Sequence, residues 1–138
     1  MTQVSKIVSF FLFPALVFLS HLIAARILHL YDFSPHIDIP FHFVGGLSIA
    51  YASTRILFYL EAEGITAGLN RVIFLILILC LTTTMTVFWE FAEFLSDQLL
   101  GTRLQPSLAN TMQDQFLGIL GGCTWVILYF ARAWKRAA

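Results

Sequence analysis

Charged residues are scarce in this sequence: Asp, Glu, Lys and Arg make up 12% of its 138 residues, and the formal net charge is zero. The eight basic residues are scattered along the chain, whereas a protein that binds nucleic acid clusters them on one surface. We therefore expect no nucleic-acid partner. Cysteine is also scarce, since Cys80 and Cys123 each stand alone in an apolar run. This spacing disfavours a structural disulfide and offers no cysteine metal site.

Apolar residues are abundant, at 59% of the chain, which is more than a soluble domain of this size can bury. A helix needs about 20 consecutive apolar residues to cross a bilayer. Four segments meet this requirement, at about residues 7–30, 40–60, 71–98 and 110–133. The sequence therefore predicts an all-α, four-helix transmembrane bundle. It forms a single integral membrane domain over residues 1–138, with membrane lipids as its immediate partners.

The first apolar segment is interpreted as a retained helix, because the hydrophobic part of a signal peptide is shorter, at about 7–15 residues. Loop-forming residues separate the four segments: Ser34-Pro35, then Gly64 to Asn70, then Gly101 to Ser107. Pro40 suits the first turn of the second helix, where its missing N–H costs nothing. Asn110 and Thr111 are predicted to cap the fourth helix.

Basic residues indicate the orientation of the spans, because cytoplasmic loops carry an excess of Lys and Arg. With both termini in the cytoplasm, six basic residues lie on that side: Lys6, Arg55, Arg71, Arg132, Lys135 and Arg136. Only Arg26 and Arg103 lie on the other side. We therefore predict a multi-pass protein whose N- and C-termini both face the cytoplasm.

Titratable residues gather at the outer ends of three predicted helices, although each costs roughly 2.5 kcal/mol or more at the bilayer centre. The second helix contributes Asp38 and His42, the third contributes Glu90, Glu93 and Asp97, and the fourth contributes Asp114. Within the second and third helices the spacing is three, four or seven residues, so these side chains share one face of their helix. The remaining histidines, His21, His29 and His36, are interpreted as interfacial or loop residues.

Glycines follow the acids on the second and fourth helices. Asp38 precedes Gly45-Gly46 by seven and eight residues, and Asp114 precedes Gly121-Gly122 by the same offsets. We interpret the match as a trace of a parallel duplication of a helical hairpin. Small residues let membrane helices approach closely. A helix-packing seam is therefore predicted at Gly45, Gly46, Gly118, Gly121 and Gly122.

Five acids and one histidine cannot all remain charged and unpaired in a low-dielectric pocket. The sequence leaves three means of compensation open: a divalent cation, shared protons, or ion pairs with Arg26 and Arg103. For the cation, the predicted ligands are His42, Glu90, Asp97 and Asp114, with Asp38 and Glu93 orienting them. Imidazole and carboxylate ligands suit one Mg²⁺, Mn²⁺, Fe²⁺ or Zn²⁺ ion without distinguishing among them.

The order of these motifs resembles a known family. The motifs are Asp38-x-x-x-His42-Phe43-x-Gly45-Gly46, Trp89-Glu90-x-x-Glu93-x-x-x-Asp97 and Asn110-Thr111-x-x-Asp114-x-x-x-Gly118. Together they look like the YjdF-type small inner-membrane proteins, which are similar in turn to VanZ-like proteins. The resemblance implies a bacterial inner-membrane location and, through the VanZ-like proteins, an association with envelope lipids or wall precursors. That pattern often has an acid at position 110, where this chain has Asn110.

Two classes of function agree with these features. The first is a membrane-embedded enzyme or binding protein that uses the acidic and histidine site on a lipid-linked or amphiphilic envelope substrate. The second is a non-catalytic membrane subunit, or a small proton- or ion-coupled carrier, whose buried acids pair or shuttle protons. A carrier with four helices would require a homo-oligomer or a larger membrane complex.

Overall fold

The computed structural model describes residues 3–66 and 68–137, with the side chains of Asp32, Pro35 and residues 132–137 outside the description. It contains four long helices: α1 (Gln3–Arg26), α2 (Asp38–Ala62), α3 (Arg71–Leu100) and α4 (Leu108–Ala137). Two short 3-10 turns, η1 (Leu30–Asp32) and η2 (Pro35–Ile37), connect α1 to α2. The four long helices all have the length and apolar composition needed to cross a membrane. The predicted four-helix architecture is therefore confirmed.

The observed helix ends differ from the predicted ones by two to four residues everywhere except at Arg71, where α3 begins, and two of the differences have a local cause. Helix α1 ends at Arg26 rather than Leu30, because His29 adopts a left-handed backbone conformation and the chain turns into η1. Helix α4 begins at Leu108, because the Ser107 side chain accepts a 3.2 Å hydrogen bond from the backbone N–H of Asn110. The prediction of Asn110 and Thr111 as caps is therefore wrong, and Ser107 has this role.

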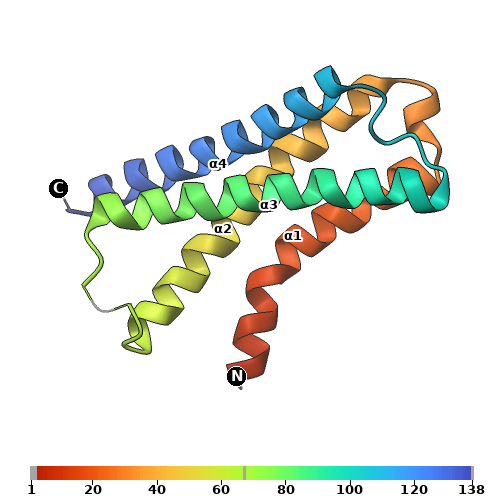
Figure 1. The fold of residues 1–138 in the computed structure, drawn as a ribbon. Coiled ribbons are helices and arrows are strands. Elements are labelled where there is room, and N and C mark those ends of the chain that lie inside the picture. The colour runs from red at the N-terminus through yellow and green to blue at the C-terminus, as the bar shows by residue number, and fades with distance from the viewer. Residues whose placement is uncertain (1–2, 67, 138) are drawn as a thin grey trace.

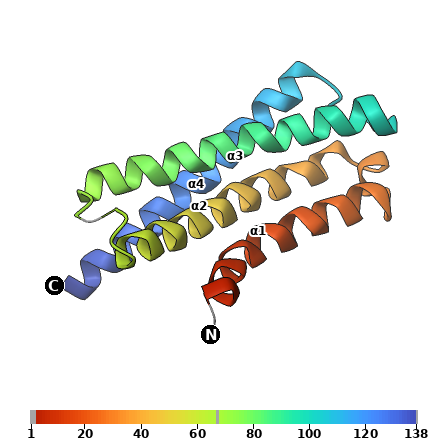
Figure 2. The ribbon, with the colours of Figure 1, turned by 60° about the horizontal axis from the view of Figure 1, so that its bottom comes forward.

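Helix α2 is the centre of the bundle and packs against all three other helices. Its largest interface is with α4, and the two helices run in the same direction (Figure 1). Both termini and the α2–α3 connection lie at one end of the bundle, while the α1–α2 and α3–α4 connections lie at the other (Figure 2). The polar ends of α2, α3 and α4 therefore meet at the end opposite the termini, as the sequence predicts.

Glycine sets the spacing between α2 and α4. A Cβ atom added at Gly46 would overlap the backbone of Gly118, and one added at Gly121 would overlap the Phe43 carbonyl oxygen. These two glycines therefore allow backbone-to-backbone contact between the helices. The other three glycines face α3 side chains: Gly45 faces Trp89, Gly118 faces Thr86 and Gly122 faces Thr82. The seam thus joins three helices, and Gly122 packs against α3 rather than α2.

The interior of the bundle changes character along its length. Toward the termini it is apolar, with Ala50, Leu57, Phe74 and Ile78 packed into one buried cluster. Toward the other end the buried residues are mostly ionisable. Large apolar side chains on all four helices are exposed on the outside of the bundle, where lipid would surround them. The fold therefore places ionisable groups inside and apolar groups outside at the same depth.

Candidate metal centre

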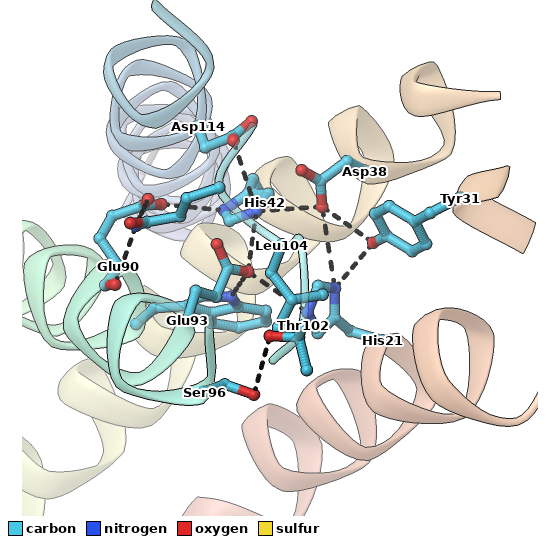
Figure 3. Close-up of polar contacts among 12 residues, drawn as sticks. His21, Tyr31, Asp38, His42, Glu90, Glu93, Ser96, Thr102, Leu104 and Asp114 are labelled. Atoms are coloured by element: carbon cyan, nitrogen blue, oxygen red, sulfur yellow. Dashed lines mark hydrogen bonds and ion pairs between the residues drawn. The ribbon is translucent and has the colours of Figure 1, made fainter. Parts of the chain in front are cut away.

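Each of the four long helices contributes to one buried group of ionisable side chains (Figure 3). Their exposed fractions are between 1% and 4%. The group contains His21 of α1, Asp38 and His42 of α2, Glu90 and Glu93 of α3, and Asp114 of α4. We call these six residues the acid–histidine centre. The structure therefore brings together five of the six site residues predicted from the sequence and adds His21.

His42 occupies the middle of the acid–histidine centre. Its Nε2 atom lies 3.1 Å from Asp38 Oδ1, 3.6 Å from Glu93 Oε1 and 3.9 Å from Asp114 Oδ2. Its Nδ1 atom lies 3.7 Å from Glu90 Oε1 on the other side of the ring. One imidazole thus faces four carboxylates, which come from three helices.

The sequence-based assignment of His21 to the interface or a loop is wrong. His21 is only 1% exposed, and its Nε2 atom lies 3.3 Å from Glu93 Oε1. Rings surround it, with the centroids of Tyr31, Phe41 and Trp89 between 5.3 and 5.7 Å away. Helix α1 ends five residues later, at Arg26, so His21 lies about one and a half turns inside the helix. It therefore belongs to the centre.

Tyr31 fixes the protonation pattern of His21. The Tyr31 hydroxyl donates a 2.8 Å hydrogen bond to Asp38 Oδ1 and lies 2.8 Å from His21 Nδ1. Burial, and after it the Asp38 carboxylate, raises the pKa of the Tyr31 phenol far above its usual range, so the phenol keeps its proton. Because that single proton goes to Asp38, His21 must donate its Nδ1–H to the Tyr31 oxygen. The lone pair of a neutral His21 is then on Nε2, facing Glu93.

Two neutral donors position the glutamates. Trp89 Nε1 donates a 2.9 Å hydrogen bond to Glu93 Oε1. Gln105, in the α3–α4 connection, donates from Nε2 to both the side-chain Oε2 and the backbone oxygen of Glu90, each at 2.9 Å. Each glutamate therefore has one oxygen held by the protein and one left over.

Several polar atoms of the centre are fully buried and have no hydrogen-bond partner within the part of the chain that the structure describes. They are Nε2 of His21 and of His42, Oε1 of Glu90, Oε2 of Glu93, and both carboxylate oxygens of Asp114. Leaving a buried polar group unpaired costs about 1–3 kcal/mol, and more when the group is charged. An unpaired set of this size, converging on one point, is typical of a site whose ligand completes the bonding.

No lysine or arginine compensates these acids within the described side chains. Arg26 and Arg103 are both exposed, and neither forms an ion pair with an acid of the centre. Structural pairing with arginine, one of the three compensations considered, is therefore not what the structure shows. The two remaining means of compensation are a bound cation and shared protons, because two imidazoles cannot by themselves neutralise four carboxylates.

The distances within the centre suit metal ligation. Three sets of three residues each offer ligand atoms that lie within 4.8 Å of one another. The sets are His21, Asp38 and Glu93; Asp38, His42 and Asp114; and His42, Glu90 and Glu93. Each set contains one imidazole and two carboxylates, and all of its members are buried. That donor set is suited to Zn²⁺, Fe²⁺ or Mn²⁺.

Asp97 does not join the other predicted ligands. It lies about two turns beyond Glu90 along α3, and its carboxylate is bonded to the α3–α4 connection. Thr102 donates its hydroxyl to Oδ1, the Leu104 N–H donates to Oδ1 at 2.8 Å, and the Gln105 N–H donates to Oδ2 at 2.9 Å. Asp97 therefore anchors the loop that carries Gln105 to Glu90.

Sequence reasoning missed three contributors, and only one of them had a usable signal. His21 interrupts a long apolar run, and the cost of an ionisable residue within a span favours a functional interpretation. Tyr31 and Gln105 lie in connections whose path is set by η1 and by the Asp97 anchor. Side chains in connections follow no helical periodicity, so the sequence pattern does not predict where they point.

The family model described as "Predicted membrane protein (DUF2238)" matches residues 2–135 of the chain. The chain belongs to the DUF2238 family. This is the YjdF-type family that the motifs of the second, third and fourth helices indicate, so the predicted family membership is confirmed. A relationship of DUF2238 to VanZ-like proteins stays a prediction. No curated protein and no solved structure matches the chain.

Proposed function

We propose that this DUF2238 protein is a multi-pass bacterial inner-membrane protein that binds a divalent cation at the acid–histidine centre and acts on a lipid-linked or amphiphilic envelope substrate. The observation that supports cation binding most strongly is the convergence of unpartnered, buried imidazole and carboxylate atoms from all four helices. Burying such atoms within a membrane is expensive unless a ligand compensates them.

The residues present fit a metal ion in both charge and donor type. His21 and His42 direct Nε2 atoms toward Glu93, and Tyr31 holds His21 in the tautomer that leaves Nε2 free. Metal-ligating histidines usually have their other ring nitrogen bonded in this manner. Trp89 and Gln105 hold one oxygen of each glutamate, so the remaining oxygens are presented in fixed positions.

A bound divalent cation supplies Lewis-acid chemistry: it polarises a carbonyl or phosphoryl oxygen and lowers the pKa of bound water. The chain's own contribution is to fix the ligands and to keep the centre dry. The rings of Phe18, Tyr31, Phe41 and Trp89 pack around His21 and exclude solvent from one side.

A small cavity between α1, α3 and the α3–α4 connection marks the side from which we expect an amphiphilic substrate to approach the centre. It has a volume of about 30 Å³ and is lined by Phe18, His21, Leu22, Ala92, Glu93, Ser96 and Leu104. Its walls are largely apolar, while His21 and Glu93 belong to the centre. Helix α1 has its main interface with α2 rather than with α3. A cavity of this size holds about two water molecules, so a substrate with an apolar chain and a polar head would reach the ligands there by separating α1 from α3.

Elemental analysis of the purified protein tests cation binding. The wild-type protein should retain a divalent cation at a fixed ratio to the chain, and Glu90→Gln and His42→Ala should each abolish or greatly weaken binding. Glu61→Gln and His36→Ala are matched controls, because both residues are exposed and lie outside the centre. Full metal content in Glu90→Gln and His42→Ala together would contradict the proposal.

Shared protons are the second candidate, favoured by a specific observation. His42 Nε2 lies 3.1 Å from Asp38 Oδ1 and His21 Nε2 lies 3.3 Å from Glu93 Oε1, so a proton carried by either imidazole nitrogen would face a carboxylate oxygen. In that case the protein is a non-catalytic membrane subunit or a proton-coupled carrier. A folded wild-type protein that takes up no divalent cation at any concentration tested would favour this candidate over the metal centre.

A further inference from the structure

We infer that the acid–histidine centre holds two divalent cations, bridged by the Glu93 carboxylate; this inference rests on the proposed metal-binding function. Three observations of the structure carry it: the charge that the centre must neutralise, the number of its ligand atoms, and the division of those atoms around Glu93.

Charge is the first observation. Asp38, Glu90, Glu93 and Asp114 carry four negative charges once they act as ligands, and the two histidines must be neutral to bind a metal. One divalent cation would leave two negative charges buried among side chains that are at most 4% exposed. Two divalent cations leave none. Uncompensated charge is expensive within a membrane, so the pair of cations is the favoured occupancy.

The supply of ligand atoms is the second observation. Four carboxylates and two imidazoles offer more donors than the four to six that a single Zn²⁺ or Mg²⁺ ion takes. The atoms that the protein leaves unpartnered come from five of the six residues, and a single four-coordinate ion would leave some of them without a partner. A second ion gives these leftover atoms a partner.

The division of the ligands is the third observation. One set contains His21, Asp38 and Glu93, and another contains His42, Glu90 and Glu93. Each set has its own imidazole and its own carboxylate, and Glu93 is the member that they share. Glu93 Oε1, which also accepts the Trp89 hydrogen bond, lies 3.3 Å from His21 Nε2 and 3.6 Å from His42 Nε2, while Glu93 Oε2 has no hydrogen-bond partner among the described residues. Asp114 adds two unpartnered oxygens on the His42 side.

This arrangement assigns a position to each ion. The first is held by His21 and Asp38, with Tyr31 bonded to both of these residues. The second is held by His42, Glu90 and Asp114, with Gln105 bonded to Glu90. Bundles that carry two metals use the same principle, in which carboxylates from facing helices bridge ions that each have one histidine.

The test is the number of Mn²⁺ ions bound per chain by the full-length protein in detergent, measured by equilibrium dialysis and elemental analysis. The wild-type protein should bind two, and its electron paramagnetic resonance spectrum should show the exchange coupling of a bridged pair. His21→Ala should bind one and show the six-line spectrum of an isolated ion. His36→Ala, an exposed control, should bind two coupled ions.

Each other result has a defined meaning. One ion in the wild-type protein overturns the pair but leaves the proposed function standing. No bound ion in the wild-type protein overturns both. Two ions without exchange coupling overturn the Glu93 bridge. If His21→Ala does not fold, His21→Gln replaces it, and the count and spectrum of the wild-type protein still decide between one ion and two.

Discussion

The backbone N–H of Leu104 donates a 2.8 Å hydrogen bond to Oδ1 of Asp97, seven residues earlier near the end of α3. Gln105 donates its own N–H to the other carboxylate oxygen, which sets the position from which its side chain reaches Glu90. Leu104 is 8% exposed, so the loop is packed against the bundle rather than extended from it. Asp97 therefore acts on the acid–histidine centre through the α3–α4 connection.

Replacing Asp97 by Asn should loosen this connection without removing cation binding. The side-chain amide of Asn would direct an N–H toward one of the two backbone N–H donors, so one hydrogen bond would be lost. Because Asp97 is partly exposed to water, the loss should lower the free energy of unfolding by about 1 kcal/mol. Hydrogen exchange of the Leu104 and Gln105 amides should accelerate, while the number of cations bound at saturation stays unchanged. Glu63→Gln, an exposed neutralisation at the other end of the bundle, is the control. A lower number of cations bound at saturation in Asp97→Asn would contradict this prediction.

The four helices were predictable because their signal is long and local. Apolar runs longer than about 20 residues, separated by Gly and Pro, are sufficient to identify spans. The ends were less predictable. Ser107, rather than Asn110, caps α4, and α1 ends before the predicted Leu30 because the chain turns at His29. A helix can begin or end at any of several neighbouring residues, and the pattern of apolar residues does not determine which one.

The acid–histidine centre was predictable where helical spacing decides which side chains share a face. Asp38 with His42, and Glu90 with Glu93, follow from spacings of four and three residues. Spacing alone cannot show that α3 continues past the centre to Leu100. Nor can it show that Asp97 contacts the α3–α4 connection rather than the other acids. Nor can it show that His21 of α1 faces the same interior, because that depends on how α1 packs against α2.

Tyr31→Phe should weaken cation binding about 10- to 100-fold, the usual effect of removing a residue that orients a metal ligand. Without the hydroxyl, His21 Nδ1 loses its partner, and nothing holds the proton away from Nε2. The dissociation constant for Mn²⁺ or Zn²⁺, measured by competition with a chelator, reports the change.

The matched control for this variant is Tyr59→Phe. Tyr59 packs its ring near Phe10, far along α2 from the centre, so the same atom is removed without touching a ligand. Equal affinities of Tyr31→Phe and the wild-type protein would show that the Tyr31 hydroxyl does not position His21.

Gly46→Ala should destabilise the bundle more than Gly45→Ala. The added Cβ at Gly46 would overlap the Gly118 backbone, which cannot move aside without separating α2 from α4. Overpacking of this kind typically costs about 1–3 kcal/mol, occasionally more. At Gly45 the nearest atom is Cζ3 of the Trp89 side chain, 3.0 Å away, which can shift. Thermal unfolding in detergent should show the difference.

Gly45→Ala is a close control because both variants gain the same helix propensity, about 0.5–1 kcal/mol. The contrast between them therefore isolates the contact. Gly121→Ala and Gly122→Ala form a second pair with a smaller expected difference, since the added Cβ would overlap the Phe43 carbonyl oxygen at Gly121 and would lie 2.8 Å from Thr82 Cγ2 at Gly122. Similar unfolding temperatures within both pairs would contradict backbone contact between α2 and α4.

The orientation of the bundle decides which side of the membrane the acid–histidine centre faces. Both termini lie at one end of the bundle, and the α1–α2 and α3–α4 connections lie at the other (Figure 1). The centre lies beside these connections, which bond to it through Tyr31 and Gln105, so cytoplasmic termini would place it in the outer half of the membrane. Six of the eight basic residues lie at the terminal end, and this bias predicts that the terminal end is cytoplasmic. Cysteine labelling of intact cells can test this prediction directly.

Phe33 and Ile65 are a matched pair for that test, because both are apolar loop residues with large exposed fractions, 83% and 69%. Phe33 lies in the α1–α2 connection beside the centre, and Ile65 lies in the α2–α3 connection at the other end. In a Cys80→Ala, Cys123→Ala background, a membrane-impermeant maleimide should label Phe33→Cys in intact cells and Ile65→Cys only after permeabilisation. The cysteine substitutions leave every charge in place, so the positive-inside bias is preserved. The opposite labelling pattern would put the centre on the cytoplasmic side and would rule out an extracytoplasmic envelope substrate.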